Sequence, residues 1–296
     1  MSNTNLDIEK YVAGELEKYG NIYIPIRASF LETLLVKSLK CTKIHPNPDD
    51  EFCNPKIGPS TRIMHEYEVK IHNAMEGSLN PWAECGDPLI VEKIHPDGYM
   101  LLNGHHRWGA AMRVGLKKVP VKIVYLTYAS DVENMLKKSK NDKRVTFDLD
   151  EIVFRKYTDD NLEKELLFPL NRIYKERIRV GFPALCHYLV THGYDIWVYT
   201  SHYYSINYIK YLFKRYHVKL TGIITGTKRK SSIENNFLAL LEQKIDQQYK
   251  LTVNVYDDEV IFIDTQSGKY EQKSFEGSDL EWSSNVKAVF SSVDND

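Results

Sequence analysis

The sequence lacks the cysteine pattern of a zinc site or of a disulfide framework. Its four cysteines, Cys41, Cys53, Cys85 and Cys186, lie far apart, and none belongs to a C-x-x-C pair. Structural zinc sites and small secreted scaffolds both depend on several cysteines at characteristic spacings. The spacing therefore argues against both classes.

Long apolar runs and an excess of one charge are also missing. No apolar run approaches the roughly 20 residues that a membrane-spanning helix needs, and the chain does not begin with a basic and apolar leader. We therefore expect a cytoplasmic protein without a membrane partner. The net charge is −1, so no overall field attracts nucleic acid, which we do not expect as a partner.

The 296 residues are enough for two domains of ordinary size, and their composition is that of a globular protein, with 43% apolar and 27% charged residues. Strand-like and helix-like segments alternate along the second half of the chain. We predict an α/β protein with a first domain over residues 1–128, a linker over 129–142 and a second domain over 143–296.

A candidate phosphate-binding site lies in the first half. A strand over Pro88–Ile94, a hairpin turn and a strand over Tyr99–Leu102 lead into Gly104, His105, His106 and Arg107, just before the helix predicted over Trp108–Val114. A glycine at such a junction lets the backbone approach a ligand, and the helix start offers N–H groups for a phosphate. Histidine and arginine add positive charge. The alternative is a polar helix cap without a ligand.

The run Leu101-Leu-Asn-Gly-His-His-Arg-Trp-Gly-Ala-Ala111, followed by Gly115 and by Val119-Pro120, resembles the ParB/sulfiredoxin-like fold. Members of this fold include partition proteins, sulfiredoxins and free serine kinases. The resemblance covers roughly residues 20–127 and implies an α+β domain in which Gly104, His105, His106 and Arg107 bind the phosphates of ATP, ADP or CTP.

Two departures from this family bear on activity. His105 stands where sulfiredoxins have a nucleophilic cysteine, which argues against sulfinate repair. Asn103 stands where kinase-like members usually have an acid, so a kinase would need another carboxylate. Glu51, Glu66 and Glu68 are the nearest candidates, and the sequence does not choose among them.

A pair of carboxylates marks the second half. The strand-like run Val145–Phe147 ends in Asp148 and Asp150. Alternate residues of a strand point to one side, so both carboxylates can face one pocket at the end of the strand, where open α/β sheets bind ligands. Such a pair can bind Mg²⁺, and one carboxylate can attack phosphorus. The alternative is a strand that stops at an Asp-rich turn.

Four predicted strands end in polar groups: Asp148-x-Asp150, Thr200-Ser201, the loop Thr225-Gly-Thr-Lys-Arg-Lys230, and Asp257-Asp258. This ordered set resembles the haloacid dehalogenase (HAD) superfamily of phosphotransferases. The resemblance implies a Rossmannoid, doubly wound parallel sheet with a minimal cap.

The same resemblance implies a role for each residue. Asp148 would be the nucleophile and Asp150 the acid and base. Thr200 would bind a phosphoryl oxygen, and Lys228 or Lys230 would neutralise charge. Mg²⁺ would be held by four carboxylates, Asp148, Asp150, Asp257 and Asp258.

Two features depart from this pattern. Glu151 stands where most of the family has glycine. Asp257-Asp258 also has the character of a hairpin turn between two strands. The leucines between Asp159 and Arg179 recur at helical spacing, which predicts a long helix there.

The sequence thus predicts Mg²⁺-dependent phosphoryl transfer through an aspartyl-phosphate, coupled to a domain that binds a nucleotide or a phosphometabolite. The partner would be a phosphorylated small molecule or a nucleotide. One alternative is a nucleotide-dependent kinase of the free-serine type in the first domain. The other is a nucleotide-sensing or DNA-associated binding protein with a degenerate HAD domain.

Overall fold

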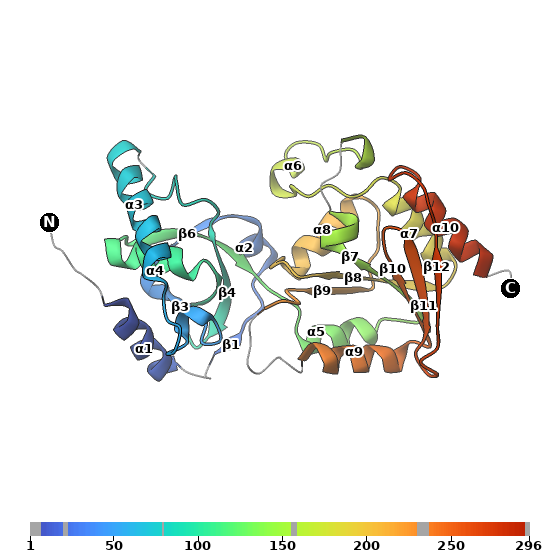
Figure 1. Ribbon diagram of the computed structural model, residues 1–296, viewed down its shortest axis with the longest axis horizontal. Coiled ribbons are helices and arrows are strands. Elements are labelled where there is room, and N and C mark those ends of the chain that lie inside the picture. The colour runs from blue at the N-terminus through green and yellow to red at the C-terminus, as the bar shows by residue number, and fades with distance from the viewer. Residues whose placement is uncertain (1–6, 20–22, 79, 155–158, 230–236, 294–296) are drawn as a thin grey trace. The chain divides into compact units, whose positions relative to one another are not determined.

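The computed structural model describes residues 7–19, 23–78, 80–154, 159–229 and 237–293 (Figure 1). Contacts within the chain separate unit 1, over Met1–Tyr125 and Arg229–Ser232, from unit 2, over Leu126–Lys228 and Ile233–Asp296. Both units mix helices with one sheet. No helix in the described ranges is long and apolar enough to span a bilayer.

The sheet of unit 1 is mixed, with the strand order β2-β6-β4-β5-β3 and with β1 paired to β4. Its elements are α1 (Ile8–Tyr19), β1 (Ile24–Pro25), α2 (Phe30–Leu34), β2 (Lys37–Lys40), β3 (Ile44–Pro46), α3 (Thr61–Gly77), β4 (Leu89–His95), β5 (Tyr99–Asn103), α4 (His105–Val114) and β6 (Lys118–Val124). The predicted hairpin is present, because β4 and β5 pair antiparallel and lead directly into α4. Helices α3 and α4 pack together.

Trp108 anchors α4 in the core of unit 1. Its side chain is fully buried, and its indole N–H donates to the carbonyl oxygen of Cys41 at 3.2 Å. This bond satisfies the one polar group of the ring, so the tryptophan can be buried without an unpaired donor. The anchor fixes the helix whose first residues form the predicted phosphate site.

Unit 2 contains a six-stranded sheet with the order β12-β11-β10-β7-β8-β9. Its strands are β7 (Lys143–Asp148), β8 (Tyr194–Thr200), β9 (Gly222–Thr225), β10 (Leu251–Val255), β11 (Glu259–Asp264) and β12 (Tyr270–Ser274), and its helices are α5 (Ala129–Leu136), α6 (Leu170–Ile173), α7 (Phe182–Thr191), α8 (Ile206–Arg215), α9 (Phe237–Gln248) and α10 (Trp282–Val293). The strands β10, β7, β8 and β9 are parallel, whereas β11 and β12 pair antiparallel at one edge. The predicted parallel sheet is therefore confirmed for four strands.

Helices cover both faces of this sheet, with α5 and α9 on one side and α7, α8 and α10 on the other (Figure 1). The ring of Phe147 on β7 contacts Phe182 of α7 and Trp282 of α10, with centroids 4.9 and 6.5 Å apart. On the opposite face, a second apolar cluster joins α5 and α9 to β8 and β9; it consists of Val132, Trp197, Ile224, Leu241, Ile245 and Tyr249. The α5 helix, expected to be part of a linker, thus packs within unit 2.

The long helix predicted between residues 159 and 179 is wrong. The described part of this segment holds only a short 3₁₀ turn (Asp159–Asn161) and α6. Its two ends pair instead, because Glu163 N–H donates to Ile178 O at 2.7 Å and Val180 N–H donates to Asn161 O at 2.9 Å. Pro169 lies in the middle, where it would interrupt a helix. The leucine spacing resembled a buried helical stripe, yet Leu167 is 84% exposed.

Candidate functional site

The start of α4 is built around Gly104. This residue is the N-cap of the helix and has a left-handed backbone with φ of 98°, and no side chain caps the helix. A Cβ at this position would lie 2.5 Å from Leu89 Cδ2, so a larger residue would be both strained and crowded. Glycine is thus required by geometry, as the sequence indicated.

The two histidines of the predicted site hold a neighbouring segment in place. His105 Nε2 accepts a hydrogen bond from Asn47 N–H at 3.2 Å, and His106 Nε2 accepts one from Ser60 N–H at 3.0 Å. An imidazole nitrogen that accepts a hydrogen bond carries no proton. In addition, burial lowers the pKa of His106, although Asp50 and Glu51 oppose that shift. The histidines therefore position residues 47–60 beside the start of α4.

Arg107 is the cation of this site. Its guanidinium donates to the carbonyl oxygen of Asp87 and to Asn103 Oδ1, the latter at 3.2 Å. Both partners are neutral, and no carboxylate in the described part of the chain pairs with Arg107. Its position is thus fixed while its charge remains available to an anion.

The three candidate acids lie in different surroundings. Glu66 pairs with Arg62 at 2.6 Å on the exposed side of α3, and Glu68 pairs with Arg113 at 3.2 Å. Glu51 belongs to the segment that His105 and His106 hold, and it lines a pocket of about 510 Å³ together with Asp49 and Asp50. Among the three, Glu51 is therefore the acid best placed to act beside the start of α4.

In unit 2, Asp148 ends β7 at the edge where the strands β10, β7, β8 and β9 all have their carboxyl ends. A π-helical turn, Leu149–Val153, follows at once and directs two backbone N–H groups at the carboxylate. Asp148 Oδ1 accepts from Asp150 N–H at 2.7 Å and from Glu151 N–H at 2.9 Å. Burial raises the pKa of Asp148 despite these bonds. The second oxygen, Oδ2, has no hydrogen bond among the described residues and can meet a ligand.

Asp150 occupies a nest of donors that the sequence showed only in part. Its carboxylate accepts from Thr200 Oγ1 at 2.6 Å, from Ser201 N–H at 2.7 Å and from Ser201 Oγ at 2.8 Å. His202 Nδ1 lies 2.8 Å away. Burial alone would raise the pKa of Asp150, but these donors lower it below the ordinary value. The structure thus joins Asp150 to Thr200, which was predicted to bind a phosphoryl oxygen, and favours an ionised carboxylate over a proton donor.

The loop after β9 is tied to the loop after β8. Gly226 N–H donates to His202 O, and Thr227 N–H donates to Thr200 O, both at 3.1 Å. Lys228 follows immediately and is exposed, so the structure brings its loop to the same strand ends. Lys230 lies outside the described residues.

The predicted magnesium ligands are not gathered into one cluster. Asp257 pairs with Arg179 at 2.6 Å, and Asp258 is exposed in the turn between β10 and β11. Asp150 is engaged by its four donors. Among the residues that the structure describes, no three His, Cys, Asp or Glu side chains are placed to hold a metal ion. This arrangement does not fit Mg²⁺, and we derive no step through a metal.

Sequence reasoning missed two residues around these strand ends. Arg179 is buried, pairs with both Asp257 and Asp279, and lies over the ring of Trp282 at 4.3 Å. His202 contacts Asp150 with a side chain that is 66% exposed. Only the position of His202, two residues after Thr200, could have indicated its role. Nothing local to Arg179 marks its partners, which lie 78 and 100 residues away.

Comparison with known proteins bears on the first of these sites. A family model described as the ParB N-terminal domain matches residues 33–140. This span contains the start of α4, and it ends before residues 143–296, so it does not test the HAD resemblance. A search of curated proteins gave no match.

Solved structures give weaker likenesses. Two crystal structures of the C-terminally truncated chromosome-partitioning protein ParB from Caulobacter crescentus, one complexed with CTP-gamma-S and one with the centromeric parS site, each match 36% of this chain, at 22% and 21% identity and with TM-scores of 0.24. The match spans 59% and 51% of those chains. A conserved hypothetical protein from Pyrococcus furiosus matches at 13% identity with a TM-score of 0.20, covering 90% of this chain and 88% of its own. Residues 33–140 of this chain are thus similar to the ParB N-terminal domain.

Proposed function

We propose that unit 1 binds a nucleotide through the start of α4. The observation that carries this proposal is the coincidence of the ParB family match with a glycine-initiated helix whose first turn holds an arginine that pairs with no carboxylate among the described residues. The positive end of the helix dipole and the guanidinium would both attract phosphate groups. The candidates are ATP, ADP and CTP.

The experiment compares Arg107→Gln with the parent chain by calorimetric titration of each nucleotide. Charge-assisted hydrogen bonds contribute about 1.5–3 kcal/mol, so we expect a loss in affinity on the order of ten- to a hundredfold. Arg113→Gln is the matched control, because Arg113 lies in the last turn of the same helix and pairs with Glu68. Equal affinities of Arg107→Gln and the parent would refute this site. CTP is the first ligand to titrate, since the Caulobacter protein was crystallised with its analogue.

A second candidate function is phosphoryl transfer by unit 2. It is supported by the four polar strand ends, which lie at one edge of four adjacent parallel strands. Asp148 Oδ2 would attack the phosphorus atom and form an aspartyl-phosphate as the P–O bond to the alcohol breaks. The alcohol oxygen takes up a proton from solvent water, and a second water then attacks the aspartyl-phosphate, which releases inorganic phosphate and restores the carboxylate. The N–H groups of residues 150 and 151 hold Asp148 in place for this attack.

The test is hydrolysis of p-nitrophenyl phosphate by the parent and by Asp148→Asn, each in Mg²⁺ and in EDTA. We expect turnover by the parent and loss by at least a factor of about 10³ in the variant, because the nucleophile is removed. Asp142→Asn is the control, since Asp142 is exposed, pairs with Lys250 and precedes the start of β7. A folded but inactive parent would eliminate this function, and the comparison of Mg²⁺ with EDTA tests the predicted metal dependence.

Two further functions follow from the sequence and have their own tests. For a kinase in unit 1, Glu51 would activate the acceptor hydroxyl, and transfer of label from a nucleoside triphosphate to serine would reveal it. Association with DNA has little support from a net charge of −1. One of the Caulobacter structures nevertheless holds a parS site, so a mobility-shift titration at two salt concentrations is warranted.

A further inference from the structure

A pocket of about 520 Å³ opens on the face of the unit 2 sheet that carries α5 and α9. Its lining residues come from β7, β8, β10, β11 and α9 and from the segments that follow β7, β10 and β11. We call it the β7–β10 pocket, and its lining includes Arg144, Thr146, Asp148, Glu151, Tyr199, Glu242, Asp246, Thr252, Asn254 and Asp264. Its volume is in the range of small-molecule sites. Asp148, the proposed nucleophile, lies at one end.

Polar and apolar residues alternate along β7 and β10, so the sequence makes one face of these strands polar. Val145 and Phe147 on β7, with Val253 and Val255 on β10, are buried, and Phe147 and Val255 form part of the pocket lining. The alternating polar residues of the two strands all line the pocket: Arg144, Thr146, Asp148, Thr252 and Asn254. Strands inside a parallel sheet are normally apolar on both faces, because helices cover both. A polar row on two such neighbouring strands is suited to water or a polar ligand, not to another protein layer.

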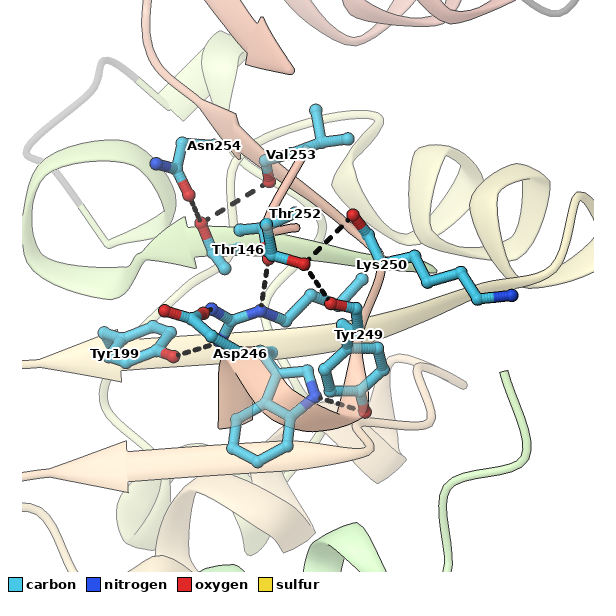
Figure 2. Close-up of polar contacts among 11 residues, drawn as sticks. Thr146, Tyr199, Asp246, Tyr249, Lys250, Thr252, Val253 and Asn254 are labelled. Atoms are coloured by element: carbon cyan, nitrogen blue, oxygen red, sulfur yellow. Dashed lines mark hydrogen bonds and ion pairs between the residues drawn. The ribbon is translucent and has the colours of Figure 1, made fainter. Parts of the chain in front are cut away.

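The floor of this pocket is held in place before any ligand arrives. Arg144 donates to Thr252 Oγ1 at 2.8 Å, to the hydroxyl of Tyr199 at 2.9 Å and to Asp246 at 2.7 Å (Figure 2). Thr146 Oγ1 donates to Asn254 Oδ1 at 2.6 Å, which leaves the Asn254 amide N–H groups for other acceptors. Side chains fixed in this way lose little entropy when a ligand binds.

The charges of the lining select the ligand. Asp148, Glu151, Glu242, Asp246 and Asp264 bring carboxylates to the pocket. Among the lining residues that the structure describes, Arg144 is the one cation, and it is paired with Asp246. An anionic group in the pocket would meet like charges, whereas hydroxyl or ammonium groups would find acceptors. Carboxylates discriminate against anions even where they add little affinity.

We propose that the β7–β10 pocket binds the alcohol part of a phosphate monoester that is turned over at Asp148, and that this part is rich in hydroxyl or amino groups and bears no second negative charge. The inference rests on the proposed phosphoryl transfer, because it places the phosphorus at Asp148. It assigns unit 2 to phosphorylated polyols and amino alcohols, and it excludes bisphosphates and phosphorylated acids.

The experiment uses three probes of similar size and different charge: glucosamine 6-phosphate, glucose 6-phosphate and 6-phosphogluconate. We expect kcat/KM to fall in that order, with a ratio between the first and the last on the order of tenfold or more. Glu242→Gln removes one carboxylate of the rim and should reduce this ratio severalfold. Glu271→Gln, on β12 and outside the lining, should leave it unchanged.

The possible outcomes distinguish a failure of this inference from a failure of the phosphoryl transfer on which it rests. If the parent cleaves 6-phosphogluconate as fast as the amino sugar, the inference is wrong and phosphoryl transfer stands. If the parent cleaves no ester, including p-nitrophenyl phosphate, the phosphoryl transfer fails. Binding of free glucosamine, weakened in Glu242→Gln, would then support the pocket alone, and its absence would overturn the pocket as well.

Discussion

At the scale of single residues, each predicted site is defined by its hydrogen bonds, its ion pairs and its backbone conformation. Gly104 and Gly115 flank the same helix and both have a left-handed backbone, with φ of 98° and 82°. Only Gly104 is crowded, by Leu89, while nothing lies within 4 Å of a Cβ at Gly115. Alanine substitutions at the two glycines therefore separate the energetic cost of backbone strain from the cost of steric overlap.

We predict that Gly104→Ala destabilises unit 1 by about 2–4 kcal/mol, the sum of left-handed strain and overpacking. Gly115→Ala should cost only about 1–2 kcal/mol, from strain alone. The measurement is hydrogen exchange of the α4 amides in the full chain at increasing denaturant. Equal losses in the two variants would show that Leu89 gives way to the added methyl group.

Asp257 distinguishes a structural ion pair from a metal site. Asp257 is one of two carboxylates that pair with the buried Arg179. We predict that Asp257→Asn lowers the free energy of unfolding of unit 2 by about 1–2 kcal/mol, allowing for the partial exposure of Asp257. Asp258→Asn, next to it and exposed, should change it by less than about 0.5 kcal/mol. Urea unfolding measures both. A Mg²⁺-dependent rise in stability that either variant abolishes would instead favour the predicted metal site.

At the scale of elements, the segment over residues 47–60 depends on a neutral imidazole. Burial lowers the pKa of His106, so the folded state binds its proton less readily than the unfolded state. The resulting stabilisation is complete above the unfolded pKa of about 6.5 and is lost as the pH falls through and below that value.

We therefore predict that protection of the Ser60 amide, which donates to His106, decreases between pH 7.5 and pH 5 after correction for intrinsic exchange. His106→Gln should flatten this dependence, because an amide oxygen can accept the same bond and does not titrate. His72→Gln, on α3, is the control. An unchanged dependence in His106→Gln would assign the effect to other groups.

The sequence predicted elements and strand ends better than the contacts between them. The hairpin before α4 and the four parallel strands followed from alternation and from turn residues. The partners of Arg179 did not, because they are distant in the chain and no local pattern specifies them. The segment over residues 159–179 failed for a related reason: pairing between its ends replaced the helix that its leucines suggested.

At the scale of the whole molecule, the two units have separate cores and separate proposed ligands. Their responses can therefore be measured in one chain. Of the four tryptophans, Trp82 and Trp108 belong to unit 1, and Trp197 and Trp282 to unit 2. Fluorescence alone would mix the two units, so peptide-resolved hydrogen exchange is the suitable measurement.

We predict that a nucleotide at about 100 times its Kd slows exchange in α4 and in residues 47–60 by the equivalent of about 2.7 kcal/mol, where opening of unit 1 releases the ligand. The exchange rates of peptides from β7 and β10 should not change, because the nucleotide binds at the start of α4 and not in the β7–β10 pocket. Glucosamine should slow exchange in the peptides from β7 and β10 and leave exchange in α4 and in residues 47–60 unchanged. Protection of β7 by the nucleotide would show instead that unit 2 is the nucleotide site, and Arg107→Gln would then leave that protection intact.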